Sequence, residues 1–130
     1  MHNRSEPTYQ DYLNDVVSDL KECVRIAKDV GISDDKIILD PGVGFGKTYQ
    51  MNLEIINHVD VLHSLGFPIL LGTSRKSVIG QTLNLPTDQR VEGTLATTVV
   101  GVLKGCAFVR VHDIKENKRV IQMTEAIMGR

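Results

Sequence analysis

The sequence predicts an α/β fold built on a parallel sheet, and three observations support this prediction. Segments with the three-to-four spacing of an amphipathic helix alternate with short apolar runs. A glycine follows each helical segment where its apolar pattern stops. The apolar runs are continuous, which is typical of strands that are covered on both faces of a parallel sheet. This alternation of helix and strand indicates consecutive βα units.

Four helices are expected from the apolar spacing. The first covers residues 8–30, with Thr8 near its start and Gly31 as its stop. Asp113 and Glu116 have the spacing of a capping box at the start of the last helix. The other three helices are expected at residues 51–65, 91–104 and 115–128, ending at Gly66, Gly105 and Gly129.

Three parallel strands are expected, at about residues 36–40, 68–72 and 107–111. The intervals from Gly31 to Gly66 and from Gly66 to Gly105 are 35 and 39 residues, and eight such units would need about 280 residues, the size of a (β/α)₈ barrel. Three strands and four helices cannot close a barrel, and open strand edges invite pairing with another chain. We therefore expect residues 1–130 to form one partial domain that lacks the first strands of a barrel, or a half-barrel that self-associates.

The composition is that of an ordinary globular protein, with 42% hydrophobic and 24% charged residues. Lys and Arg number 15 and Asp and Glu 16, and this balance argues against nucleic acid or a membrane surface as a partner. No apolar run approaches the roughly 20 residues of a membrane-spanning helix, and the first ten residues lack the apolar core of a signal peptide. The two distant cysteines, Cys23 and Cys106, fit a reducing compartment, so a cytoplasmic location is expected.

The connections that follow the strands are longer and more polar than those that precede them, and in parallel α/β folds ligands bind at these carboxyl ends. The first such loop runs from Asp40 to Thr48. A carboxylate at the end of an apolar strand needs a partner, and a hydrogen-bonding heterocycle would supply one. One alternative is a flexible glycine turn. Another is a Walker phosphate loop, since residues 46–48 read Gly-Lys-Thr, although Pro41 stands where that motif needs glycine.

The second loop, Gly72 to Ser77, combines two cations with three hydroxyls ahead of a short helix. Backbone amides at a helix start bind anions, and Lys76 adds a point charge, so an anion site is predicted. A solvated basic turn is the alternative. In the third loop, Arg110 and His112 lie two positions apart on the same side of a strand, which favours a phosphate or pyrophosphate clamp.

The remaining histidines give no metal signature. His58 and His63 sit in a helical segment without other ligand residues at metal-binding spacing, and we expect them at the surface or at its boundary. No HExxH or CxxC motif occurs, so no metal held by this chain alone is predicted.

At these loops the sequence resembles the dihydropteroate synthase family, the folate-pathway enzymes that sulfonamides inhibit. The resemblance implies the C-terminal part of a (β/α)₈ TIM barrel. It also implies a transferase that condenses 6-hydroxymethyl-7,8-dihydropterin pyrophosphate with p-aminobenzoate, releasing pyrophosphate with the help of Mg²⁺. The matching segments are Asp40–Lys47, Thr73–Ser77 with Ile79-Gly80, Arg90 with Gly93-Thr94, and Arg110–Asp113.

The resemblance also implies which residues bind substrate. Asp40 would hydrogen-bond the pterin ring and Met1 would touch it, while Phe45 and Ser77 would border p-aminobenzoate. The full substrate-binding set implied in this way is Met1, Asp40, Phe45, Gly72, Ser74, Lys76, Ser77, Arg110 and His112.

The catalytic residues implied by the resemblance are Lys76, Arg110 and His112. Lys76 would lie between the two substrates, and Ser74, Arg110 and His112 would bind or border the pyrophosphate. The main Mg²⁺ ligand of the family lies in strands that these residues do not include. We therefore expect this chain alone to be inactive, and we expect the protein to form a homodimer.

Three other functions stay open from the sequence. The first is a related methyltransferase domain that binds methyl-tetrahydrofolate in the same barrel and needs no p-aminobenzoate. The second is a non-catalytic pterin- or anion-binding module that buries its sheet edges against a copy of itself. The third is a nucleotide-binding phosphate loop, in which Lys47 would matter more than Lys76.

Overall fold

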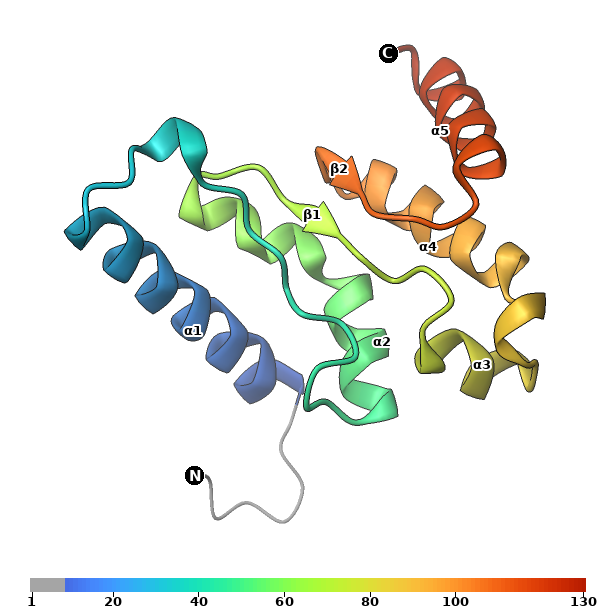
Figure 1. The fold of residues 1–130 in the computed structure, drawn as a ribbon, viewed down its shortest axis with the longest axis horizontal. Helices are drawn as coiled ribbons and strands as arrows, with labels where there is room; N and C mark the ends of the chain where they lie inside the picture. The colour runs from blue at the N-terminus through green and yellow to red at the C-terminus, as the bar shows by residue number, and fades with distance from the viewer. Residues whose placement is uncertain (1–8) are drawn as a thin grey trace.

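The computed structural model describes residues 9–130, and Figure 1 shows its strand segments running between two groups of helices. Met1 and Thr8, both singled out from the sequence, lie outside the described residues. The α-helices are α1 (Tyr9–Asp29), α2 (Tyr49–Asn57), α3 (Ser77–Leu83), α4 (Val91–Leu103) and α5 (Ile114–Met128). The strands are β1 (Leu70–Leu71) and β2 (Phe108–Val109), and the 3₁₀ helices are η1 (Asp34–Lys36), η2 (Val59–Leu65) and η3 (Thr87–Gln89).

The strand segments pair in parallel, which confirms the α/β class. Leu70 and Leu71 of β1 pair with Phe108 and Val109 of β2. The expected strand at 36–40 contributes one parallel bridge, between Leu39 and Ile69, and its first residue, Lys36, belongs to η1 instead. All three strand segments are therefore shorter than the sequence predicted.

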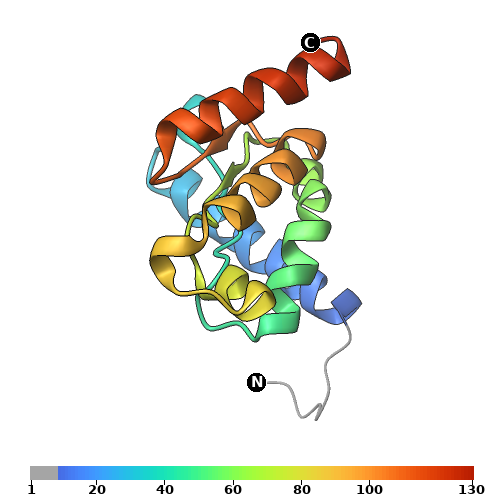
Figure 2. The ribbon, with the colours of Figure 1, turned by 90° about the vertical axis from the view of Figure 1, so that its right-hand side faces the viewer.

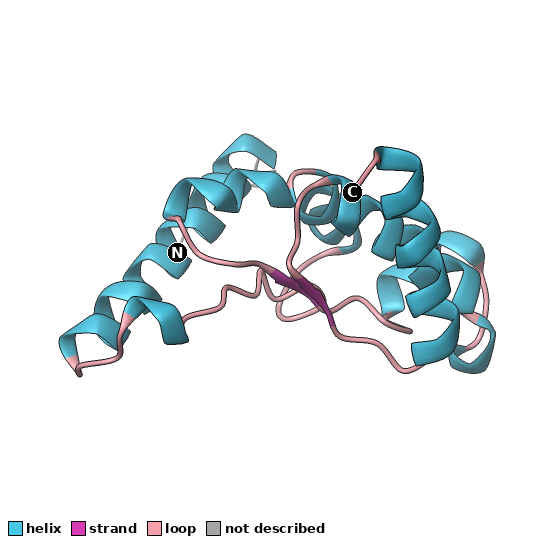
Figure 3. Ribbon diagram, turned by 90° about the horizontal axis from the view of Figure 1, so that it is seen from above, coloured by secondary structure: helices cyan, strands magenta, loops and turns pink. Residues whose placement is uncertain are grey.

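The apolar strand residues are covered on one face only within the described chain. Leu39, Ile69 and Leu71 are buried to 3% exposure or less, whereas Ile38 and Phe108 stay about half exposed. Figure 3, viewed from above, shows the helices arching over one side of the strand segments. The expectation of cover on both faces is wrong for residues 9–130, because the helices that follow each strand all return to the same side.

The four predicted stop glycines are confirmed. Gly31, Gly66, Gly105 and Gly129 all have positive φ, between 76° and 92°. In this left-handed conformation, which glycine adopts without a Cβ clash, the chain caps the last helical carbonyls. At the end of α1, for example, the amide of Ile32 reaches the Ala27 carbonyl at 3.0 Å.

The predicted helix at 51–65 is split in two. It starts at Tyr49, because the Thr48 hydroxyl accepts a hydrogen bond from the Met51 amide at 3.2 Å. The α-helix ends at Asn57, and the chain continues to Leu65 as the 3₁₀ helix η2.

Two further helix predictions need correction. The short α3 makes five α-helices among the described residues instead of four. The capping box at Asp113 and Glu116 is wrong, since the Asp113 side chain makes no cap hydrogen bond. Its carboxylate pairs instead with Arg75, 2.9 Å away, and so joins the start of α5 to a distant loop.

The core lies between the strand segments and the helices. Helix α1 packs against α2 and η2, and α4 packs against α5, as the rotated view in Figure 2 shows. The core cluster includes Leu13 of α1, Ile55 of α2 and Ile69 and Leu71 of the strand region. None of the described helices has the length and apolar character needed to cross a membrane.

Candidate functional site

The glycine loop after Leu39 is ordered by hydrogen bonds to the side chains of Asp40, at its start, and Asn52 of α2. The Asp40 carboxylate accepts from the Gly42 amide at 2.8 Å. The side chain of Asn52, only 3% exposed, accepts from the Gly44 amide at 2.8 Å. The loop is therefore a built structure and not the flexible turn that the sequence left open.

Lys47 fastens the same loop to itself. Its Nζ donates to the carbonyls of Gly42 (3.0 Å) and Phe45 (3.2 Å). Burial lowers the pKa of Lys47, while Asp19 and Asp40 oppose that shift. A Walker loop needs free amides and a lysine that points at phosphate, so these internal bonds argue against the nucleotide-binding alternative.

Lys76 reaches across to the glycine loop. Its ammonium donates to the Val43 carbonyl and lies 4.6 Å from the centre of the exposed Phe45 ring, within cation–π range. Burial lowers the pKa of Lys76, Asp40 opposes this shift, and the positive charges of Arg110 and Lys47 add to it. Three cations thus share one small region, which is the electrostatic condition for binding a multiply charged anion.

Arg110 lies over the end of the neighbouring strand. Its Nη1 is 3.6 Å from an Asp40 carboxylate oxygen. Its guanidinium occupies the space above Gly72, where a Cβ would lie 2.5 Å from Nη2. The missing side chain at position 72 is what lets the guanidinium approach this backbone. Arg110 follows β2 directly and is not within it, which corrects the expected strand end at residue 111.

Ser74 and His112 form a second contact between the loops. The Ser74 hydroxyl accepts from the His112 amide at 3.1 Å and lies 2.7 Å from the imidazole Nδ1. Because the hydroxyl oxygen accepts from the amide, its proton is free to point to Nδ1. When the hydroxyl donates to Nδ1, the imidazole carries its hydrogen on Nε2, the nitrogen that can donate to an anion.

Arg75 stands between two of these site residues and has a positive φ of 58°. Such a conformation costs a non-glycine residue about 1–2 kcal/mol. Its amide donates to Thr94 at 3.1 Å, its carbonyl accepts from Arg90 at 2.9 Å and its guanidinium pairs with Asp113. The sequence interpretation gave Arg75, Thr94 and Arg90 no separate roles, because only the tertiary structure brings them together.

We call the three loops Asp40–Thr48, Gly72–Ser77 and Arg110–Asp113 the carboxyl rim. They hold the predicted Asp40, Phe45, Gly72, Lys76 and Arg110 around the glycine loop and join Ser74 to His112. Ser77, the first residue of α3, is exposed. No polar contact links it to the others in the described chain.

The two helical histidines are exposed or half-buried, as expected. His58 lies 3.6 Å from Glu54, and His63 Nε2 is 2.8 Å from the Lys104 carbonyl, joining η2 to the end of α4. No group of three or more His, Cys, Asp and Glu side chains within residues 9–130 could hold a metal ion.

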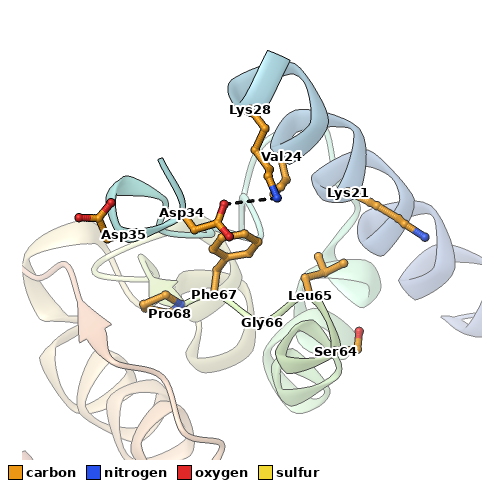
Figure 4. A pocket seen from close by; sticks show the side chains of 10 residues that line it. All are labelled: Lys21, Val24, Lys28, Asp34, Asp35, Ser64, Leu65, Gly66, Phe67 and Pro68. Carbon is orange, nitrogen blue, oxygen red and sulfur yellow. Dashed lines mark ion pairs between the residues drawn. The ribbon is translucent and has the colours of Figure 1, made fainter. Parts of the chain in front are cut away.

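A large hollow lies at the opposite end, where α1 meets the turn before β1. It has a volume of about 670 Å³. Figure 4 shows Lys28 and Asp34 paired across it, with Lys21 directed away. The pair spans 3.4 Å and both side chains are more than half exposed. A hollow lined by solvated lysines and aspartates, with no convergent buried polar groups, is a weaker site than the rim.

The parallel strand pairing and the helices packed on it define the class of this protein as an α/β protein, with cationic side chains gathered at the carboxyl rim. Comparison with known sequences makes this specific: the chain belongs to the pterin-binding enzyme family, which matches residues 1–112.

The sequence relatives carry the name dihydropteroate synthase. The protein from Clostridium beijerinckii is 57% identical over 100% of this chain, and the one from Bacillus subtilis is 49% identical over 100%. The chain covers 49% and 46% of these two relatives. It therefore spans about half the length of the curated relatives it matches.

The solved structures agree in fold. A dihydropteroate synthase from Clostridium difficile, crystallised in the presence of pteroic acid, superposes with a TM-score of 0.88 and 46% identity. It covers 98% of this chain, which in turn covers 49% of that structure. A Yersinia pestis dihydropteroate synthase in a sulfonamide complex gives a TM-score of 0.90 at 36% identity, over 97% of this chain and 46% of the other.

Proposed function

We propose that this chain is part of a dihydropteroate synthase, corresponds to the C-terminal part of its (β/α)₈ barrel and supplies part of the pterin and pyrophosphate subsites. The observation that carries the proposal is the convergence of Lys76, Arg110 and the Ser74–His112 pair on one rim beside Asp40. The 57% identity to a named synthase supports it.

The proposed reaction replaces a C–O bond with a C–N bond. The C–O bond to pyrophosphate breaks and leaves a cationic methylene carbon on the dihydropterin. The amine of p-aminobenzoate bonds to that carbon, and the amine proton passes to the solvent. Negative charge grows on the departing pyrophosphate, so donors already aimed at that position lower the barrier. In the proposal Arg110 and His112 Nε2 hold the leaving pyrophosphate, while Ser74 borders it and orients the imidazole by donating to Nδ1.

Asp40 and Lys76 orient the substrates in this proposal. The Asp40 carboxylate, held by the Gly42 amide, accepts hydrogen bonds from pterin N–H groups. Lys76, anchored on Val43 and over the Phe45 ring, places its charge between the pterin and the p-aminobenzoate side, with Ser77 nearby in sequence. Holding both reactants in one geometry supplies much of the rate gain.

The proposal includes Mg²⁺ as a companion of the pyrophosphate oxygens. The described residues do not form a cage for it, so no step assigned to this chain depends on the ion. The proposal also places the enzyme in the cytoplasm, which the unpaired Cys23 and Cys106 support. Self-association as a homodimer is supported by the exposed apolar side chains of Met123 and Ile127, which lie one turn apart on α5.

Calorimetric titration of the chain with dihydropterin pyrophosphate and Mg²⁺ tests the proposal. Binding should weaken about tenfold or more in Asp40→Asn and in Lys76→Ala, because each loses a charged contact to the ligand. The matched controls are Asp34→Asn and Lys28→Ala, the exposed pair at the opposite end. Equal weakening in the controls would contradict a site at the rim. No binding by the folded chain would show that the rest of the barrel is essential to form the site, and that binding is not a property of this chain alone.

A further inference from the structure

We propose that Arg90 is a positioning residue for the pyrophosphate subsite. It acts by holding the backbone of Arg75 in the conformation that directs Ser74 to His112 and Lys76 to the glycine loop. This inference rests on the function proposed above, to which it adds a residue outside the rim.

Arg75 occupies a turn between two residues of the proposed site. It lies between Ser74 and Lys76, and these neighbours must point to different parts of the rim, one to His112 and the other to Val43. A left-handed residue between them makes that turn. Non-glycine residues keep such a conformation only when their surroundings enforce it.

The Arg90 side chain contacts the backbone on both sides of α3. Its Nη1 donates to the Arg75 carbonyl at 2.9 Å and its Nε donates to the Leu85 carbonyl at 3.0 Å. The planar guanidinium can serve two carbonyls at once, which a lysine ammonium does with less directional control. From the start of α4, Arg90 thereby ties the loop before α3 to the segment after it.

Gly80 lies in the middle of α3. Glycine disfavours a helix interior, yet a Cβ here would lie 2.2 Å from Arg90 Nη2 and 2.4 Å from its Cζ. The guanidinium therefore occupies the space that a side chain at position 80 would need. The glycine leaves room for the Arg90 guanidinium to cross α3 and reach the Arg75 carbonyl.

Hydrogen exchange at the His112 amide tests the proposal directly, because that amide donates to Ser74 Oγ. The Leu70 amide, which donates to the Leu39 carbonyl at 2.8 Å, serves as the reference for global opening. In Arg90→Ala the exchange of His112 should rise about tenfold relative to Leu70, since a charged hydrogen bond is lost. Gly80→Ala should give the same pattern without changing any arginine, and it also serves if Arg90→Ala does not fold.

The matched control is Arg130→Ala, which removes another arginine hydrogen bond to a carbonyl on α4, that of Val102 at 3.2 Å. It should leave the His112-to-Leu70 exchange ratio unchanged. The proposal is overturned if Gly80→Ala leaves the ratio unchanged, or if both amides accelerate by the same factor.

A calorimetric titration with inorganic pyrophosphate separates this inference from the proposed function. Arg90→Ala and Gly80→Ala should each weaken binding several-fold, and Arg130→Ala should not. If the wild-type chain binds no pyrophosphate while the exchange ratio responds as expected, the proposed function of this chain fails and the positioning role stands. If binding is unchanged in variants whose ratio rises, the positioning role for the subsite is overturned.

Discussion

The two ends of the strand segments differ in how their polar groups are held. At the carboxyl rim, groups that are far apart in sequence bond directly: Ser74 and His112 are 38 positions apart and 2.7 Å from each other. At the opposite end the hollow is large, about 670 Å³, but its Lys28–Asp34 pair is 3.4 Å long and solvated. The proposed site is therefore placed at the rim, because its polar groups converge and are partnered, whereas those of the hollow are solvated.

The lengths of the connections explain this difference. The turns that precede β1 and β2 begin at Gly66 and Gly105, whose amides bond carbonyls of the helix just ended. Apart from the Lys104 carbonyl, which lies 2.8 Å from His63 Nε2, such turns satisfy their polar groups locally. The loops that follow the strands are longer, so their polar groups must find partners in neighbouring loops or in a ligand.

The largest loss of stability is expected from substitution of Asn52, whose side chain accepts a hydrogen bond from the glycine loop. Asn52→Ala should lower the free energy of unfolding by about 2–3 kcal/mol, because it removes a buried hydrogen-bond partner of Gly44 and leaves a void. Urea denaturation measures this change. Asn57→Ala, at an exposed position of the same helix, should change it by no more than about 0.5 kcal/mol. Equal losses in both variants would show that the loop does not depend on the buried amide.

Substitution of one glycine at each end should affect a different property: stability at Gly66 and pyrophosphate binding at Gly72. Gly66→Ala should cost about 1–2 kcal/mol of unfolding free energy through its left-handed backbone, φ 82°, without altering pyrophosphate binding. Gly72→Ala should do the reverse: the new methyl displaces the flexible Arg110 guanidinium and weakens pyrophosphate binding about tenfold. Denaturation and calorimetry on both variants check this. A binding loss in Gly66→Ala would contradict the division of roles.

The smallest effect is expected at Tyr12, whose buried hydroxyl has no hydrogen-bond partner among the described residues. Tyr12→Phe should raise the free energy of unfolding at neutral pH by about 1 kcal/mol, since an unsatisfied polar group leaves the core. Unlike the Ser74 hydroxyl of the rim, the Tyr12 hydroxyl makes no hydrogen bond among the described residues that the substitution would remove. A decrease in stability would show that the hydroxyl is satisfied.

The same variant carries a pH prediction. Burial raises the pKa of Tyr12 from 10.0 to about 12. Between these values the unfolded chain has lost the phenolic proton and the folded chain keeps it, so the unfolded state binds fewer protons and stability falls as pH rises. Denaturation curves from pH 9 to pH 12 should show this fall in the wild-type chain and a smaller one in Tyr12→Phe.

Much of the local structure could be predicted because its causes are local. All four stop glycines end their helices as expected, since the left-handed cap depends on the residue and its own helix. The strand at 36–40 is reduced to one bridge at Leu39, and its first residue belongs to η1, neither of which the apolar pattern shows. The Asp113 capping box failed because a more distant partner, Arg75, takes the carboxylate.

The sequence by itself determined the α/β order, the helix ends and the residue types at the rim, because periodicity and glycine positions act over a few residues. The tertiary structure decided which of those residues meet. It placed Lys76 on the Val43 carbonyl, bonded Ser74 to His112 and brought Arg90 across Gly80 to Arg75. These contacts join segments that are 15 to 38 positions apart. No local pattern contains them, since they exist only once parallel pairing has brought the strand ends side by side.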